Sequence, residues 1–126
     1  PSDGCVVSTG ANGLVGGHIA RVLLEKGYTV HGTVRPATLQ EKDKVQYLLD
    51  MAAQLTGTIK LFPVDLAVGD YDEAAEGCSA IIATAFPFLK GLTDSNASNP
   101  AFLQYQVDVA VHSSSVIMEV AQRKGL

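Results

Sequence analysis

Three glycines at fixed spacing are the residues of this sequence with the clearest chemistry. Gly10, Gly13 and Gly16 follow a short apolar run at residues 5–8 and open a stretch with helical periodicity. The first permits a tight turn, the second lets backbone N–H groups approach a pyrophosphate, and the third lets the helix lie close to the sheet. The helix N-terminus adds partial positive charge and free donors. The alternative is an empty turn, but the strand–turn–helix context favours a dinucleotide site.

The end of the next predicted strand bears on which dinucleotide such a site would bind. An NAD-selective site usually has an acidic residue about twenty residues past the glycines, where it binds the ribose 2′-hydroxyl. Residues 30–34 contain no carboxylate, and Arg35 follows at once. A guanidinium matches a 2′-phosphate, so the sequence favours NADP(H), with Lys42 and Lys44 close enough in sequence to assist. The alternative is a solvated arginine at a strand end.

The histidines and cysteines show no pattern of a metal or redox site. The three histidines, His18, His31 and His112, lack metal-ligand spacing, so we interpret them as structural and predict no metal site. Cys5 and Cys78 lie in or just before predicted strands without CxxC spacing. This arrangement predicts two reduced, buried thiols in a cytoplasmic protein, and the minor alternative is a disulfide or a redox role.

Composition limits the class of protein. The chain has 126 residues, of which 47% are hydrophobic and 17% charged, with a formal net charge of −4. This length allows one domain with a real core. The absence of a basic run argues against a nucleic-acid partner, and no apolar run is long enough for a membrane span. The first residues show no basic region followed by an apolar one, so we expect no signal peptide.

Periodicity predicts alternating strands and helices. Strands are expected at residues 5–8, 28–34, 58–64 and 80–85, and helices at about 14–26, 39–55, 70–76 and 100–124. Pro63 fits an edge position, Gly27 a left-handed helix end, and Asn99 an N-cap with Pro100 behind it. Right-handed crossovers then give a parallel sheet in the order 3-2-1-4 with helices on both faces. This is the α/β, Rossmann-type doubly wound fold, with its C-terminal half missing.

The helical periodicity also predicts which side chains are buried. The predicted buried faces are Val15, Ile19, Val22 and Leu23 on the first helix; Val45, Leu48, Leu49, Ala52 and Leu55 on the second; and Leu103, Val107, Ala110, Ser114, Ile117, Met118 and Ala121 on the last.

Short motifs along the whole chain resemble one family. They are Thr9-Gly10-x-x-Gly13-x-x-Gly16, Leu24-x-x-Gly27-Tyr28-x-Val30, Val34-Arg35, Tyr47-Leu48-Leu49, Asp65-Leu66, Gly77-Cys78 and Pro87. Together they resemble the N-terminal, cofactor-binding half of an extended short-chain dehydrogenase/reductase, in particular the plant-type dihydroflavonol reductase and cinnamoyl-CoA reductase branch.

The resemblance implies a role for each matching segment. The turn from Gly10 to Gly16 would bind the pyrophosphate, with Asn12, Leu14 and Val15 inside it. Arg35, with Lys44, would bind the 2′-phosphate of NADPH. Asp65 and Leu66 would flank the adenine, while Thr84, Ala85 and Phe86 would lie beneath the ribose on the nicotinamide side.

The same resemblance implies what the chain lacks. The catalytic serine and Tyr-x-x-x-Lys pair of the family lie beyond the matching part, and none of the four tyrosines here has a lysine four residues later. We therefore name no catalytic residue. We expect residues 1–126 to be a partial NADP-binding domain of a reductase for a carbonyl or CoA-thioester substrate, unable to catalyse alone. The alternatives are a non-catalytic NADP sensor and an interaction module that self-associates through the edge of the fourth strand.

Overall fold

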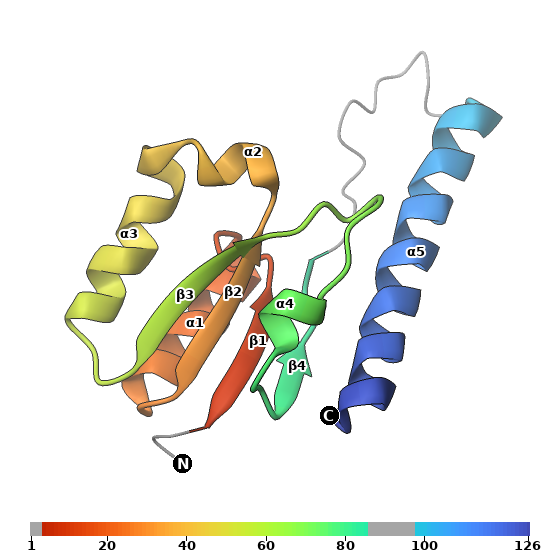
Figure 1. Cartoon of the computed structure of the whole chain (residues 1–126). Coiled ribbons are helices and arrows are strands. Elements are labelled where there is room, and N and C mark those ends of the chain that lie inside the picture. The colour runs from red at the N-terminus through yellow and green to blue at the C-terminus, as the bar shows by residue number, and fades with distance from the viewer. Residues whose placement is uncertain (1–3, 86–97) are drawn as a thin grey trace.

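Four parallel strands form one sheet in the order β3-β2-β1-β4 (Figure 1). The computed structural model describes residues 4–85 and 98–126. The observed order is the predicted one, and because all four strands are parallel, their carboxyl ends lie at one edge of the sheet. The strands are β1 Cys5–Thr9, β2 Thr29–Val34, β3 Thr58–Pro63 and β4 Ala80–Ile82.

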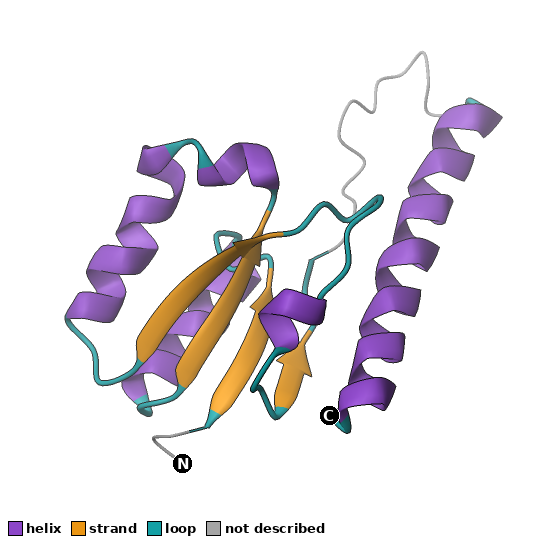
Figure 2. Cartoon of the chain, viewed as in Figure 1, coloured by secondary structure: helices purple, strands orange, loops and turns teal. Residues whose placement is uncertain are grey.

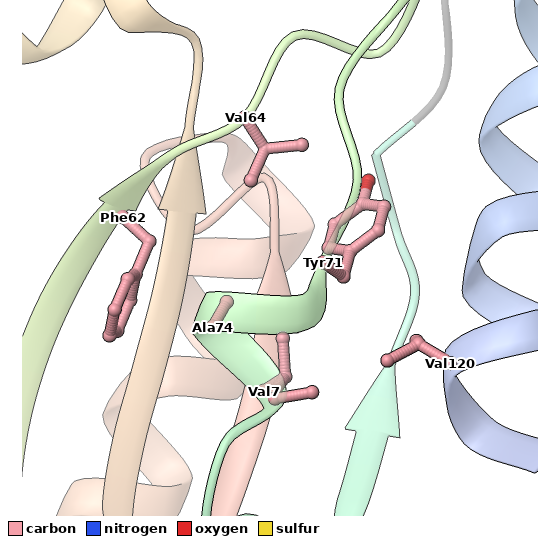
Figure 3. Packing of buried hydrophobic residues seen from close by; sticks show 7 residues of the cluster. Val7, Phe62, Val64, Tyr71, Ala74 and Val120 are labelled. Atoms are coloured by element: carbon pink, nitrogen blue, oxygen red, sulfur yellow. The ribbon is translucent and has the colours of Figure 1, made fainter. Parts of the chain in front are cut away.

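Helices cover both faces of the sheet, and Figure 2 shows α1 behind it and α4 in front. On one face, Ala20 and Leu24 of α1 form a core with Val30 of β2. On the other face, Val7 of β1 and Phe62 of β3 form a core with Tyr71, the N-cap of α4, and Val120 of α5 (Figure 3). The two cores give the predicted doubly wound arrangement. The helices are α1 Leu14–Glu25, α2 Pro36–Leu39, α3 Lys42–Ala53, α4 Asp72–Ala75 and α5 Pro100–Lys124.

The helix predicted at residues 39–55 is observed as α3, Lys42–Ala53, and a separate short helix, α2, precedes it. Pro36 occupies the first turn of α2, and the residue before it, Arg35, is extended with φ −62° and ψ 144°, as a residue before proline prefers. The short helix closes with a bond from the Glu41 N–H to the Thr38 carbonyl. Glu41 then leaves the helical region, with φ −97° and ψ 89°, before α3 begins.

Strand β4 is also shorter than predicted, because the chain leaves the ladder after Ile82. The N–H groups of Thr84 and Ala85 bond to the side chain of Thr9 instead of to a strand. The predicted edge position of Pro63 is confirmed, since it ends β3, the outermost strand.

The predicted buried face of α1 is wrong in part. The buried residues are Gly16, Ala20 and Leu24, while Val15 is 59% exposed and Val22 is 48% exposed. The helix turns its small residues inward because its first turn lies against the backbone of the glycine turn. A Cβ on Gly16 would stand 2.1 Å from the Gly10 carbonyl oxygen.

The predicted inner face of α5 is also wrong in part, although Ile117 packs against the core as predicted. The helix buries Val109, Ser113 and Val120, whereas Leu103, Val107 and Met118 are exposed. The predicted Asn99 cap is confirmed, because its side chain accepts hydrogen bonds from two backbone N–H groups of the first turn. At the other end of α5, the Lys124 Nζ lies 2.7 Å from the Glu76 Oε2, and Arg123 forms an ion pair with Asp72. These two ion pairs link the last turn of α5 to α4 and the residue after it. Hydrogen bonding and charge from Lys124 lower the pKa of Glu76.

Gly16 and Gly17 offer a matched test of this packing. In Gly16→Ala the new methyl group would meet the Gly10 backbone, so we expect a loss of about 3 kcal/mol in the free energy of unfolding. In Gly17→Ala the methyl would be 3.5 Å from the Ala11 carbonyl oxygen, an ordinary contact, and helix propensity favours alanine by about 1 kcal/mol. Urea unfolding measures both. Equal effects of the two substitutions would contradict the close approach of α1 to the turn.

Candidate nucleotide-binding site

The glycine turn lies at the carboxyl end of β1, where α1 begins. Gly10 has φ +63°, a left-handed conformation that favours glycine. The Gly13 N–H then donates to the Gly10 carbonyl over 2.9 Å, which closes the turn. Gly13 is the N-cap of α1, and no side chain caps the helix there, nor does its first turn carry an acidic residue. The first N–H groups of this 12-residue helix are thus left for an anion at the sheet edge.

Neighbouring elements hold the turn in place on two sides. The Ala11 N–H donates to the carbonyl of Thr33 on β2 over 3.1 Å. On the other side, the Tyr47 hydroxyl of α3 donates to the Asn12 carbonyl over 3.0 Å. Burial raises the pKa of Tyr47, so its hydroxyl keeps the proton that this bond needs. These contacts fix the backbone before any ligand binds.

Thr9 is a site residue that the sequence reasoning missed. It is fully buried, and its Oγ1 accepts hydrogen bonds from the N–H groups of Thr84 at 2.8 Å and Ala85 at 3.0 Å. The Thr84 hydroxyl in turn donates to the Thr9 carbonyl over 2.8 Å. Thr9 therefore fixes the segment after β4 against the glycine turn. The signal in the sequence was a hydroxyl residue directly before Gly10, at the end of a buried strand.

The predicted phosphate-binding cations differ in their surroundings. Arg35 is exposed at the end of β2, two residues after Thr33, whose carbonyl holds the glycine turn. Among the described residues, no side chain forms an ion pair with Arg35. Lys44, by contrast, lies 2.9 Å from Glu41 in an ion pair. Of these two cations, only Lys44 has a carboxylate partner among the described residues.

The remaining predicted site residues lie after β3 and β4. Asp65 is exposed, and its Oδ1 accepts from the Ala67 N–H over 2.8 Å, which shapes the loop after β3. Leu66 beside it is half-buried. Thr84 and Ala85 lie against the glycine turn, and the Ala85 Cβ would be 3.3 Å from a Cβ on Gly10. Phe86 lies outside the described residues.

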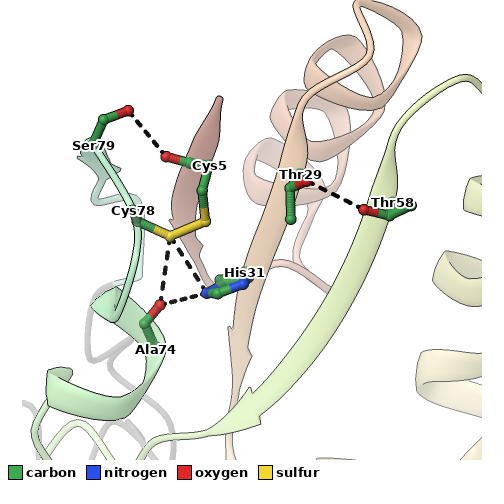
Figure 4. The surroundings of a disulfide bond; sticks show 7 residues. All are labelled: Cys5, Thr29, His31, Thr58, Ala74, Cys78 and Ser79. Atoms are coloured by element: carbon green, nitrogen blue, oxygen red, sulfur yellow. Dashed lines mark hydrogen bonds between the residues drawn. A yellow bond between two sulfur atoms is a disulfide. The ribbon is translucent and has the colours of Figure 1, made fainter. Parts of the chain in front are cut away.

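The prediction of two reduced thiols is wrong. Cys5 and Cys78, 73 residues apart, are joined by a disulfide with 4.4 Å between their Cα atoms (Figure 4). The pairing arises because β1 and β4 run in parallel with Val6 opposite Ala80. Sequence spacing alone does not reveal this register. The bond lies at the amino ends of the strands, on the sheet edge opposite the glycine turn.

His31 lies beside this disulfide, and the interpretation of it as an isolated structural residue missed that neighbourhood. Its Nδ1 is 3.4 Å from the Cys78 Sγ and 2.7 Å from the Ala74 carbonyl oxygen. The Nδ1 and the two sulfur atoms all lie within 4.8 Å of one another. His112, on α5, contacts the Gly69 carbonyl through Nε2 at 3.0 Å.

Comparison with known sequences matches the chain to one family profile and to several plant reductases. The profile of the GDP-mannose 4,6 dehydratase family matches residues 7–74, more than half of the chain. The bifunctional dihydroflavonol 4-reductase/flavanone 4-reductase of Pyrus communis is 45% identical over 83 residues, which are 65% of this chain and 23% of that protein. The cinnamoyl-CoA reductase CAD2 of Medicago truncatula is 36% identical over 95 residues, 73% of this chain and 28% of that one. The chain thus spans about a quarter of the length of these relatives.

Comparison with solved structures shows the fold. A short-chain dehydrogenase from Burkholderia cenocepacia, solved in complex with NADP, aligns with a TM-score of 0.71 at 20% identity, covering 97% of this chain and 50% of that one. Vestitone reductase from alfalfa aligns with a TM-score of 0.62 at 24% identity, covering 94% and 32%. Within residues 4–85 and 98–126, no helix is long and apolar enough to cross a membrane. The strand order, the glycine turn and the family match together show that the chain belongs to the extended short-chain dehydrogenases/reductases, within the GDP-mannose 4,6 dehydratase family.

Proposed function

We propose that this chain is the NADP(H)-binding domain of a reductase acting on a carbonyl or CoA-thioester substrate. The observation that carries the proposal is the uncapped N-terminus of α1, which the glycine turn directs at the carboxyl edge of the sheet. Hydrogen bonds with Thr33, Tyr47 and Thr84 hold residues 9–12 in place. The names of the relatives, which include reductases of dihydroflavonols and of cinnamoyl-CoA, support the substrate class. When bound, the nicotinamide supplies the hydride, and the chain's own residues bind and orient it.

In this proposal the site divides into three parts along the carboxyl edge of the sheet. Residues 10–16 bind the pyrophosphate through backbone N–H groups. Arg35 binds the 2′-phosphate, while Lys44 contributes only if the phosphate replaces Glu41 as its partner. Asp65 and Leu66 border the adenine, and the residues after β4 support the ribose on the nicotinamide side. A cytoplasmic location belongs to the same proposal.

Proton transfer is not assigned to this chain. No tyrosine of the sequence has a lysine four residues later, so none has the neighbouring cation that would favour its ionised form. The competing proposal is a module that binds NADP without turnover. Both proposals use the same binding site, and measurable oxidation of NADPH with a carbonyl substrate by the purified chain would exclude the second.

Arg35→Ala tests the choice of dinucleotide. A charge-assisted contact contributes roughly 1.5–3 kcal/mol, so its loss should weaken NADPH binding by about one to two orders of magnitude. NADH lacks the 2′-phosphate and should bind nearly as before. Calorimetric titration with both cofactors measures the two affinities. Lys26→Ala, which removes one exposed positive charge at the far end of α1, is the control, and equal weakening of NADPH and NADH by Arg35→Ala would refute the assignment.

Thr9→Val tests whether the site is fixed before the cofactor binds. The valine keeps the shape of the side chain but leaves the Thr84 and Ala85 N–H groups without their acceptor, which should cost about 2 kcal/mol or more of unfolding free energy. NADPH binding should weaken together with stability. Urea unfolding and calorimetry measure the two effects. Ser79→Ala, which removes an exposed hydroxyl that donates to the Cys5 carbonyl, should change both by much less.

Self-association through the edge of β4 stays a prediction. Among the described residues β4 pairs with β1 alone, and a shallow apolar groove beside it is lined by Leu14, Val15, Ile19, Val22 and Ile82. Unpaired apolar strand edges favour association. We expect sedimentation velocity at micromolar concentration to show dimers or larger species, and Ile82→Lys to reduce them. Val68→Lys, at an exposed loop position, should not, and a monomeric parent chain would count against the idea.

A further inference from the structure

A compact group of sulfur and imidazole atoms lies at the edge of the sheet opposite the glycine turn. Cys5 begins β1, Cys78 comes two residues before β4, and His31 lies on β2. All three residues are half-buried, so none is fully enclosed in the core. None takes part in the proposed cofactor site. Their convergence from three separate segments therefore requires an explanation of its own.

The surroundings of His31 determine which ring nitrogen carries a proton. A carbonyl oxygen only accepts hydrogen bonds, so the Nδ1 that lies 2.7 Å from the Ala74 oxygen must be the donor. The same Nδ1 atom lies 3.4 Å from the Cys78 Sγ. Once the disulfide is reduced, this N–H can also donate to a thiolate at Cys78. A neighbouring imidazole N–H favours the thiolate, which is the nucleophile in disulfide exchange.

The backbone keeps the two cysteines together whether or not they are bonded. The Ser79 N–H donates to the Cys5 carbonyl over 2.9 Å, and the Ser79 hydroxyl donates to the same oxygen over 3.2 Å. The β1–β4 register continues directly from this point. Reduction therefore leaves Cys5 positioned to attack a sulfur at Cys78.

We propose that Cys5, Cys78 and His31 form a thiol–disulfide exchange site for low-molecular-weight disulfides of the glutathione type. The Cys78 thiolate attacks one sulfur of the oxidised reagent, whose S–S bond breaks, and a mixed disulfide forms as the first reagent thiolate leaves. The Cys5 thiolate then attacks the Cys78 sulfur and releases the second reagent thiol. Two protein thiols are oxidised, one reagent disulfide is reduced to two thiols, and the two protons end on the released thiols.

The disulfide state constrains the fold as well. It links the start of β1 to the connection between α4 and β4 and closes a loop with a sequence separation of 73 residues. A cross-link of this span restricts the unfolded chain, so the oxidised protein should melt roughly 10 °C above the reduced one.

The experiment uses the full chain, reduced, freed of reductant and kept in EDTA. It is mixed with glutathione disulfide at neutral pH, quenched with a maleimide at timed intervals and analysed by mass spectrometry. We expect loss of two hydrogens without a lasting glutathione adduct. Cys5→Ser should accumulate the adduct at Cys78, and Cys78→Ser should form an adduct at Cys5 about ten-fold more slowly, because it lacks the His31 contact.

Substitutions at His31 and His112 test whether His31 activates the Cys78 thiol. His31→Gln should slow adduct formation in the Cys5→Ser background by about ten-fold, while His112→Gln in that background should not. If His31→Gln does not fold, the two cysteine variants still decide the order of attack. Thiols that stay free, equal rates at the two cysteines, or an unchanged melting temperature on oxidation would overturn the proposal. So would one equivalent of Zn²⁺ that binds the reduced chain without EDTA and is lost in Cys5→Ser, because the site would then be a metal centre.

Discussion

The close approach of α1 to the turn after β1 is the constraint on which the rest of the structure depends. The space for a side chain at Gly16 is already filled by the Gly10 carbonyl, so the helix begins directly against the backbone of the turn. This contact selects the inner face of α1, which consists of Gly16, Ala20 and Leu24. It also directs the uncapped helix N-terminus at the carboxyl edge of the sheet. One backbone contact thus sets both the packing of the first helix and the position of the anion site.

The turn itself is positioned by polar contacts and not by apolar burial. Thr33, Tyr47 and Thr9 each hold a different part of the site by hydrogen bonds, and they come from β2, α3 and β1. The Thr9 hydroxyl and carbonyl bind both the backbone and the side chain of Thr84. Fixing the backbone during folding means that a cofactor does not have to order it on binding. The charged part of the site is less constrained, since Arg35 is exposed and Lys44 is paired with Glu41.

Local signals in the sequence predicted the fold, and contacts between distant segments account for what was missed. Strand order followed from alternating elements and the glycine turn, and the Asn99 cap from side-chain chemistry that acts within one helical turn. Periodicity predicted the buried face of α1 only in part, because its larger apolar residues form a second stripe that stays exposed at Val15 and Val22. Thr9 and the Cys5–Cys78 bond depend on the β1–β4 register, which no spacing rule contains. The roles assigned to Arg35, Asp65 and Leu66 remain predictions.

The pairing of β1 with β4 joins two strands that lie far apart in the sequence. The ladder between them has three residue pairs, whereas the β2–β3 ladder has six. It is held at its carboxyl end by Thr9 with Thr84 and Ala85, and at its amino end by Ser79 with Cys5 and by the disulfide. A three-pair ladder alone offers little resistance to opening, and opening would move Thr84 and Ala85 away from the glycine turn. The bonds at the amino end therefore stabilise the same strand pair that shapes the cofactor edge, although no cysteine lies near it.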